Sequence, residues 1–435
     1  MITPFSLLFL MALLSIALHR SISLKLLSLL SLLGAIYMTL QGIGVPLSGF
    51  ALNSSTQLFE LIVEIVLFAL ILHEKEDITI TQTLFIGSAS LLMLESNNLL
   101  TFIISFEALS IISVVLVSFI QTKEEANGAI KMFIASAIST AIIFLGVFFY
   151  ILGGAELLLP LKTTTNSFET FGVFIIFVGI FYKLTIVPFH SWSIDTYALV
   201  RHSNGAILSG VAKTVVVVSA FNLFSPFIST HLDFSVILLS TLSIITMTFG
   251  NFMALFEQRL SKILAYSSIA HAGYMLLAFI AIKSSFASIG LTYMAIAYIF
   301  MQTASFLVLD ILRKTYNIKT LEDLKGFKRQ NPLLSLLFTI QIFSLAGIPL
   351  LAGFLAKAVL FYSIVDAGYW YIVLIALLNS ALSVGYYAWI IKAIYFDKKE
   401  SKTKELVSIE LPILAQIILV IGTLYFGIFA WVLFL

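Results

Sequence analysis

The sequence has no cysteine and very few charged residues. Of its 435 residues, 11% are Asp, Glu, Lys or Arg, and 60% are hydrophobic. Without cysteine the chain forms no disulfide, no thiolate-bound iron–sulfur cluster and no cysteine nucleophile. Soluble domains carry roughly 25% charged residues. The low charge and a mean hydropathy of +1.09 therefore predict an all-α, polytopic membrane protein. The net charge of +2 is too small to indicate nucleic-acid binding.

Cofactor motifs are also missing. The histidines lie mostly at the ends of apolar runs and do not form the facing pairs on adjacent helices that hold haem. No glycine-rich phosphate loop, nucleophile elbow or metal motif occurs. We therefore expect no bound cofactor and no metal. The chain begins in an apolar run without a basic leader, which predicts a first membrane helix rather than a cleaved signal peptide.

Apolar runs of membrane length fill most of the chain. A bilayer core of about 30 Å needs about 20 apolar residues per helix. On this criterion the sequence predicts fourteen spans. They cover 3–19, 22–40, 55–73, 79–95, 98–120, 127–152, 168–188, 205–224, 234–255, 262–282, 286–312, 333–363, 370–396 and 409–434. The span at 333–363 is long enough to be broken, and Ala346-Gly-Ile-Pro349 is the expected break.

Basic residues predict the orientation of these spans. Of the 24 lysines and arginines, eighteen fall in connections on one side, and two, Lys162 and Lys283, on the other. The positive-inside rule makes the basic side cytoplasmic, so a cell (inner) membrane protein with both termini outside is predicted. The basic clusters at 313–329 and 392–404 are alternatively lipid-binding patches. The remaining four lysines lie within apolar spans: Lys131, Lys183, Lys213 and Lys357.

The spans also predict an internal repeat. The predicted parts are three N-terminal helices in 1–78, a five-helix unit in 79–224, a second unit in 234–396 and a last helix in 409–435. With five helices each, the second unit must be inverted relative to the first. Each contains a proline-broken helix that carries a lysine, Lys183 with Pro188 and Lys357 with Pro349. Inverted repeats with broken helices are typical of transporters.

Glu107 gives the buried lysines a chemical partner. It lies in the middle of a span, in Ser105-Phe-Glu-Ala-Leu-Ser110. Burial disfavours the charged form of a lysine, and a nearby carboxylate favours it. Moving the carboxylate therefore switches the lysine between its charged and neutral forms, which predicts a proton relay without metal or redox cofactor. Static ion pairs, or lysines that extend to the membrane surface, are the alternative.

Two histidines lie near this predicted relay. Histidine has an unperturbed pKa of about 6.5, so His271 is a candidate station between Lys213 and Lys357; a packing role is the alternative. His190 follows Pro188 near the predicted cytoplasmic side. It either lines an access path or stabilises the hinge.

Six segments together resemble a known family. They are Phe106-Glu107, Gly128-Ala-Ile-Lys-Met-Phe133, Tyr182-Lys-Leu-Thr-Ile-Val-Pro-Phe-His-Ser-Trp192, Gly250-Asn-Phe-Met-Ala-Leu255, Lys262-Ile-Leu-Ala-Tyr-Ser-Ser-Ile-Ala-His-Ala-Gly-Tyr274 and Leu345-Ala-Gly-Ile-Pro-Leu-Leu-Ala-Gly-Phe-Leu-Ala-Lys357. On these segments the chain resembles the antiporter-like, proton-translocating membrane subunits of respiratory complex I, which are related to Mrp cation/proton antiporters. The motif around Lys131 and the lysine at the second broken helix favour the N-type subunit.

The resemblance implies a role for each candidate residue. By this resemblance Glu107 and Lys183 form the carboxylate–lysine pair of the first half-channel, and Lys131 modulates that pair. Lys213 passes the proton across the centre, His271 lies on the hydrophilic axis, and Lys357 is the terminal station. The helices broken at Pro188 and Pro349 act as gates. The resemblance also implies other membrane subunits of a respiratory complex as partners, protons as cargo with Na+ left open, and no redox centre in this chain. The loop at 193–205 departs from the family pattern, with Trp192-Ser-Ile-Asp195 in place of Trp-x-Pro-Asp.

Three functions follow. The first is a proton-translocating membrane subunit of a complex I-like quinone oxidoreductase with NADH or another donor. The alternative is a subunit of an Mrp-type Na+/H+ antiporter or a membrane-bound hydrogenase complex. Antiport needs a cation site of oxygens, for which Glu60 and Glu64, four residues apart on one helix face, are candidates. The third is a scaffold with static lysines.

Overall fold

The fold is described from a computed structural model. It describes residues 3–17, 23–44, 50–52, 54–119, 122–158, 166–397 and 410–429. The predicted spans at 3–19, 22–40, 98–120 and 409–434, and the basic cluster at 392–404, extend in part outside these residues. Lys162 lies outside them altogether.

The described chain is all-α, as the sequence predicts. Its helices are α1 (Pro4–Ala17), α2 (Ser23–Leu40), α3 (Ser54–His73), α4 (Asp77–Glu95), α5 (Leu99–Ser118), α6 (Lys123–Leu152), α7 (Ser167–Leu184), α8 (Ser191–Leu199), α9 (His202–Ala206), α10 (Lys213–Thr230), α11 (Leu232–Ala254), α12 (Leu260–Leu276), α13 (Ala287–Tyr316), α14 (Pro332–Ala346), α15 (Ala352–Asp366), α16 (Trp370–Tyr395) and α17 (Leu411–Ile428). A π-helical turn, Ile207–Ala212, joins α9 to α10, and the 3₁₀ turns are Leu277–Ile280 and Phe327–Arg329.

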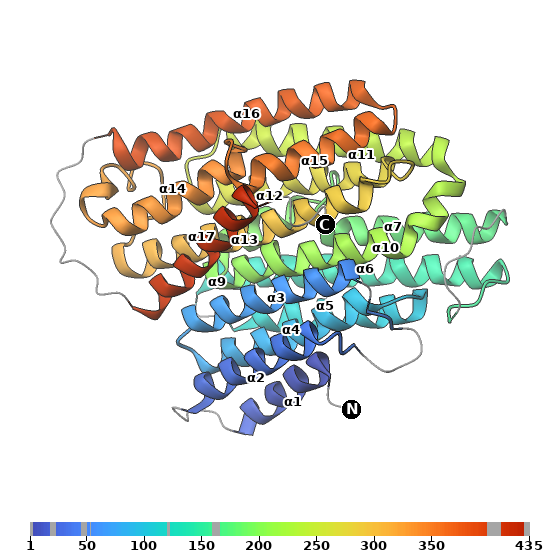
Figure 1. The fold of residues 1–435 in the computed structure, drawn as a ribbon, viewed down its shortest axis with the longest axis horizontal. Helices are drawn as coiled ribbons and strands as arrows, with labels where there is room; N and C mark the ends of the chain where they lie inside the picture. The colour runs from blue at the N-terminus through green and yellow to red at the C-terminus, as the bar shows by residue number, and fades with distance from the viewer. Residues whose placement is uncertain are drawn as a thin grey trace.

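Most helices lie side by side, with α1 and α2 at one edge of the bundle and α16 at the other (Figure 1). The last helix, α17, crosses the others obliquely and packs on α3 and α13. Through this contact α17 ties the N-terminal helices to the C-terminal half of the bundle.

The centre of the bundle is formed by α10, α12 and α13. These helices are buried on nearly all sides, whereas α6, α11 and α16 each keep a broad exposed face. A helix that is apolar all round is stable only when it is enclosed. Polar residues on the central helices are therefore held inside the protein, away from lipid.

Eleven of the described helical segments are long and apolar enough to cross a membrane. Three shorter apolar segments, Pro4–Ile16, Leu24–Leu40 and Pro332–Ala346, accompany them. A polytopic membrane protein is therefore confirmed. The count of fourteen spans and the division into inverted units stay predictions, since three predicted spans correspond to these shorter segments.

Several predicted boundaries are wrong. The span predicted at 205–224 is a helical segment that runs from His202 to Thr230 through the π-helical turn, with Pro226 inside it. The helix expected to reach Pro188 already ends at Leu184. The break expected within 346–349 is present, because α14 ends at Ala346 and α15 begins at Ala352.

Glycines allow two neighbouring helix pairs to approach closely. A Cβ placed on Gly172 of α7 would lie 2.6 Å from the Gly146 oxygen of α6 and 2.6 Å from the Tyr150 nitrogen. On the pair α11–α12, a Cβ on Gly250 would lie 2.6 Å from the Ala270 nitrogen. Small residues are common where membrane helices make backbone contact. These contacts fix the positions of α7 and α12.

Gly172→Ala is expected to lower the thermal unfolding temperature of the purified protein. The added methyl group meets backbone atoms that cannot rotate away, and overpacking of this kind costs about 1–3 kcal/mol. Gly385→Ala is the control, because its Cβ would meet only the end of the Leu255 side chain, at 3.0 Å. Equal unfolding temperatures for the two variants would contradict the packing argument.

Candidate functional site

The two broken helices end in the same way. In α7 the Thr185 N–H donates to Phe181 and Tyr182, and the Ile186 N–H donates to Phe181. In α14 the Gly347 N–H donates to the carbonyls of Phe343 and Ser344, and the Ile348 N–H donates to the Phe343 carbonyl. Thr185 and Gly347 both adopt the left-handed conformation, with φ of 62° and 87°. This is the Schellman type of helix end, and it leaves the carbonyls just before each break available.

Lys183 lies in the last turn of α7 and is buried. Its Nζ has no hydrogen-bond partner among the described residues. Glu107 of α5 is close enough to interact with it electrostatically, but the two form no direct ion pair. Instead, both Glu107 oxygens accept from the Thr140 hydroxyl of α6, at 3.0 and 2.8 Å. Glu107 also lines an apolar hollow of about 480 Å³ between α5 and α6.

Lys213 joins the first break to the central helices. It is the first residue of α10 and is buried. Its Nζ donates to Thr185 Oγ1 at 2.8 Å, to Ser268 Oγ at 2.6 Å and to the Ser268 carbonyl at 3.2 Å. Ser268 Oγ also accepts from the Tyr298 hydroxyl of α13, at 2.9 Å. Three acceptors match the three N–H groups of an ammonium group.

His271 is buried on α12, one turn beyond Ser268. Its Nδ1 lies 2.9 Å from the Ser267 carbonyl, and its Nε2 has no partner within the described chain. A carbonyl only accepts, so Nδ1 carries the hydrogen in the neutral ring and Nε2 is left as an acceptor. Its ring centroid lies 5.1 Å from that of Tyr298 and 5.8 Å from that of Tyr274. His271 therefore lies between the tyrosine bonded to Ser268 and the tyrosine beside the next lysine.

Lys357 lies on α15 and reaches back to the end of α14. Its Nζ donates to the carbonyls of Leu345 and Ala346 at 3.2 and 3.3 Å, and to Ser380 Oγ at 3.1 Å. It also lies 5.4 Å from the centroid of the Tyr274 ring. A cation is favoured at a helix C-terminus, where the carbonyls carry partial negative charge. Lys357, like Lys213, thus has three acceptors.

The structure does not bring every predicted residue to this axis. Lys131, predicted to lie within the apolar span, is half exposed near the start of α6 and forms an ion pair with Asp195 of α8. His190 precedes α8, and its ring packs on Phe249 with centroids 4.3 Å apart. Pro188 lies in the segment between α7 and α8, beyond the end of α7.

Sequence reasoning missed the groups that connect the lysines. Thr185, Ser268 and Tyr298 lie between them, and Tyr274 is held by Asn251 Nδ2 at 3.2 Å from its hydroxyl. Ser268 and Asn251 lie in motifs that the sequence singled out. Tyr298 lies in an apolar run with no signal of its own.

The comparisons with known proteins identify the family of this chain. The family described as NADH:quinone oxidoreductase/Mrp antiporter, TM matches residues 96–383. The chain belongs to this family. F(420)H(2) dehydrogenase subunit N of Methanosarcina mazei is 32% identical over 373 residues, which cover 82% of this chain and 75% of that protein. NADH-quinone oxidoreductase subunit N 1 of Thermodesulfovibrio yellowstonii is 33% identical over 354 residues, with coverage of 79% and 75%.

A chain of respiratory complex I from Thermus thermophilus has the same fold as this family member. The TM-score is 0.85 at 23% identity, with 98% of this chain and 97% of that chain covered. Because both relatives are subunits N, the prediction of an N-type, antiporter-like member of the family is confirmed.

Ser268→Ala is expected to destabilise the protein, because it removes an acceptor of Lys213 and of Tyr298 at once. Hydrogen bonds between membrane helices are worth about 1–2 kcal/mol. Ser363→Ala is the matched control, since that buried hydroxyl bonds only within its own helix, to Leu360. The thermal unfolding temperature is measured for both variants. If Ser268→Ala lowers it no more than Ser363→Ala does, Ser268 does not bridge Lys213 and Tyr298 in a way that stabilises the protein.

Proposed function

We propose that this chain is a proton-translocating membrane subunit of a complex I-like quinone oxidoreductase. Protons cross it along Glu107, Lys183, Lys213, His271 and Lys357. The observation that carries this proposal is the position of Lys213, whose bonds to Thr185 and Ser268 link the first broken helix to the helix of His271. Other membrane subunits and the bilayer are its partners, and both termini lie on the outer side.

The lysines differ in how well their charge is solvated. Lys213 and Lys357 each have three acceptors, whereas Lys183 has none among the described residues. The charge of Lys183 is therefore held by attraction to Glu107. The Thr140 hydroxyl competes for that carboxylate from α6. When Glu107 is drawn away from Lys183, the proton of Lys183 moves to a better acceptor.

The proton then passes through Lys213 and His271 to Lys357. His271 Nε2 takes a proton while Nδ1 keeps its hydrogen bond to Ser267, so the ring changes charge without turning. Lys357 is the terminal station, held by the end of α14. Movement at the breaks near Pro188 and Pro349 changes the acceptors around Lys213 and Lys357, which makes both breaks gates. Lys131, paired with Asp195, modulates the potential at Glu107 from the exposed face of α6.

The same residues support two inverted units, 79–224 and 234–396. Each unit has a titratable group on its second helix, Glu107 on α5 and His271 on α12. Each then has a broken helix with the same end geometry and a lysine beside the break. Residues 1–78 and 409–435 flank the units.

Na+/H+ antiport is the second candidate, because the family includes Mrp antiporters. Glu60 and Glu64, the candidates for a cation site, are both buried, and a Glu64 carboxylate oxygen accepts from the Thr39 hydroxyl at 2.9 Å. No group of three His, Asp or Glu side chains that could hold a metal ion occurs in the described residues. Lysines offer no oxygen ligand to a cation, so the buried lysines favour protons as the ion that is moved. The relatives carry the names of two different oxidoreductases, so the electron donor depends on the partner subunits.

Lys183→Met is expected to lower the number of protons pumped per electron in the assembled complex, because it removes the first lysine of the path. Lys283→Met, at an exposed loop position, is the control. Proton pumping and quinone reduction are measured on the same vesicles. Pumping that stays at the wild-type ratio in Lys183→Met would overturn the relay.

Thr185→Gly is expected to reduce pumping while leaving stability near that of the wild type. Glycine suits the left-handed conformation better than threonine does, which offsets the lost bond to Lys213. Thr185→Ser keeps the hydroxyl and is expected to pump more than Thr185→Gly. Equal pumping by the two variants would show that the hydroxyl has no part in transfer.

A further inference from the structure

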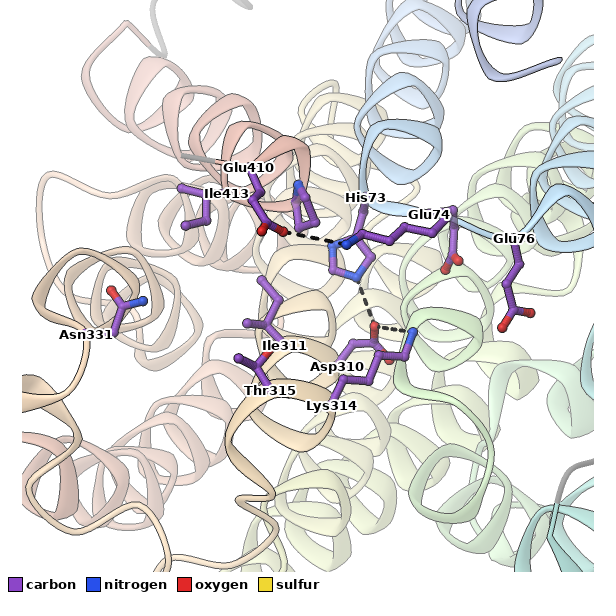
Figure 2. A pocket seen from close by; sticks show the side chains of 12 residues that line it. His73, Glu74, Glu76, Asp310, Ile311, Lys314, Thr315, Asn331, Glu410 and Ile413 are labelled. Atoms are coloured by element: carbon purple, nitrogen blue, oxygen red, sulfur yellow. Dashed lines mark hydrogen bonds and ion pairs between the residues drawn. The ribbon is translucent and has the colours of Figure 1, made fainter. Parts of the chain in front are cut away.

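A second polar cluster lies where α3 and α13 end, away from the lysine axis. Asp310 is buried on α13, and its Oδ2 accepts from Lys314 Nζ at 2.8 Å. His73 Nε2 lies 3.0 Å from the same oxygen, and both side chains are 4% exposed. Figure 2 shows the His73 imidazole and the Lys314 ammonium group both pointing at this one carboxylate oxygen. The His73 Nδ1 has no partner in the described structure.

Two cavities of about 310 Å³ each meet at Asp310 and Lys314. The first is the pocket of Figure 2, beside His73 and the start of α17; the second extends towards the start of α9. Both are large enough for several waters. The charged and titratable groups facing the cluster from the surrounding elements are Glu74, Lys75, Glu76, Glu125, Arg201, His202, Arg313, Lys319 and Glu410. Arg201 pairs with Glu76 and Lys75 with Glu410, which leaves no large net charge at the opening.

Polar atoms without protein partners continue inward from this cluster. On α9 they are His202 Nδ1, Ser203 Oγ and Asn204 Oδ1, and on α13 they are Gln302 Oε1 and Thr303 Oγ1, all buried and unpaired within the described residues. Helix α9 and the π-helical turn after it pack against α13. Buried polar atoms are nearly always bonded to protein or ordered water. Waters are therefore expected beside these atoms at the contact between α9 and α13, which we call the α9–α13 seam. Asn204 also faces α5, where its Nδ2 donates to the Leu116 carbonyl at 3.0 Å.

The inner end of the seam meets the lysine axis. Gln302 Nε2 lies 3.4 Å from Ser209 Oγ in the π-helical turn. One turn further along α13, the Tyr298 hydroxyl bonds Ser268 Oγ, which accepts from Lys213. Tyr298 precedes Asp310 by twelve residues, or about 18 Å along a helix. Single π-helical turns often mark functional sites.

We propose that His73, Asp310 and Lys314 form a proton-uptake site, and that waters in the α9–α13 seam carry its protons to Lys213. His73 Nδ1 takes a proton from water, His73 Nε2 gives one to Asp310, and Asp310 gives one to the next water of the seam. One proton enters and one leaves, with no change of oxidation state. His73 is then left with its hydrogen on Nδ1, and a turn of the ring about its Cβ–Cγ bond brings the protonated nitrogen back to Asp310 before the next proton is taken. Lys314 holds the carboxylate in place. This inference rests on the proposed relay and adds its loading step: Lys213 passes the incoming proton to Lys183, where it stays until Glu107 is drawn away.

The first test is Asp310→Asn in the assembled complex, with Glu322→Gln, an exposed carboxylate, as the control. Asp310→Asn is expected to lose the larger part of the pumping that Lys183→Met loses, because the amide cannot relay a proton between His73 and the seam. If Lys183→Met loses pumping and Asp310→Asn keeps it, the uptake site is wrong and the relay stands. If neither variant loses pumping, the relay itself is wrong.

A second test does not depend on how well Asp310→Asn assembles. The chain has no cysteine, so a single introduced thiol can be followed by the mass of this chain. Thr303→Cys and Ser203→Cys in the assembled complex are treated with a small, charged methanethiosulfonate reagent. They are expected to react several-fold faster than Val308→Cys, which is buried on the same helix nearer the opening. Equal rates would overturn the hydrated seam.

Discussion

The structure depends on surrounding a lysine ammonium group with acceptors inside a bundle of apolar helices. Intact membrane helices offer few acceptors, because their carbonyls are already bonded within the helix. Here the acceptors are hydroxyls, the carbonyls freed at the end of α14 and, for Lys213, the Ser268 carbonyl within α12. Lys357 uses the end of α14, and Lys213 uses Thr185 in the first break. The broken helices are thus a requirement of the buried charges.

The central helices separate this polar axis from lipid. Because α10, α12 and α13 are enclosed, Ser268, His271 and Tyr298 contact protein on every side. Close glycine contacts set the position of α12 against α11, so the acceptors of Lys213 are held on a rigid support. Tyr274 is fixed in the same way by Asn251, and it lies between His271 and Lys357.

The residues of this site that could be predicted from the sequence are those that are unusual in a membrane helix, namely charged residues and prolines. Lys183, Lys213 and Lys357 stand out because charge is rare in an apolar run, and the break near Pro349 stands out because proline disrupts helices. Lys131 does lie within the apolar helix α6, but a run of apolar residues does not show that its side chain is half exposed beside Asp195. Asp310 escaped notice near a predicted span end, because its partner His73 is distant in sequence and meets it only through packing.

Thr185 shows why the two breaks are related but unequal. A β-branched residue in the left-handed conformation is strained, and such strain persists only where the surroundings impose it. Gly347 holds the same position in α14 without strain, and a Cβ there would lie 3.3 Å from Lys357 Nζ. In α14 the glycine leaves room for a lysine to reach the helix end. In α7 the threonine hydroxyl instead binds Lys213. Lys183, two residues before Thr185, has no acceptor among the described residues.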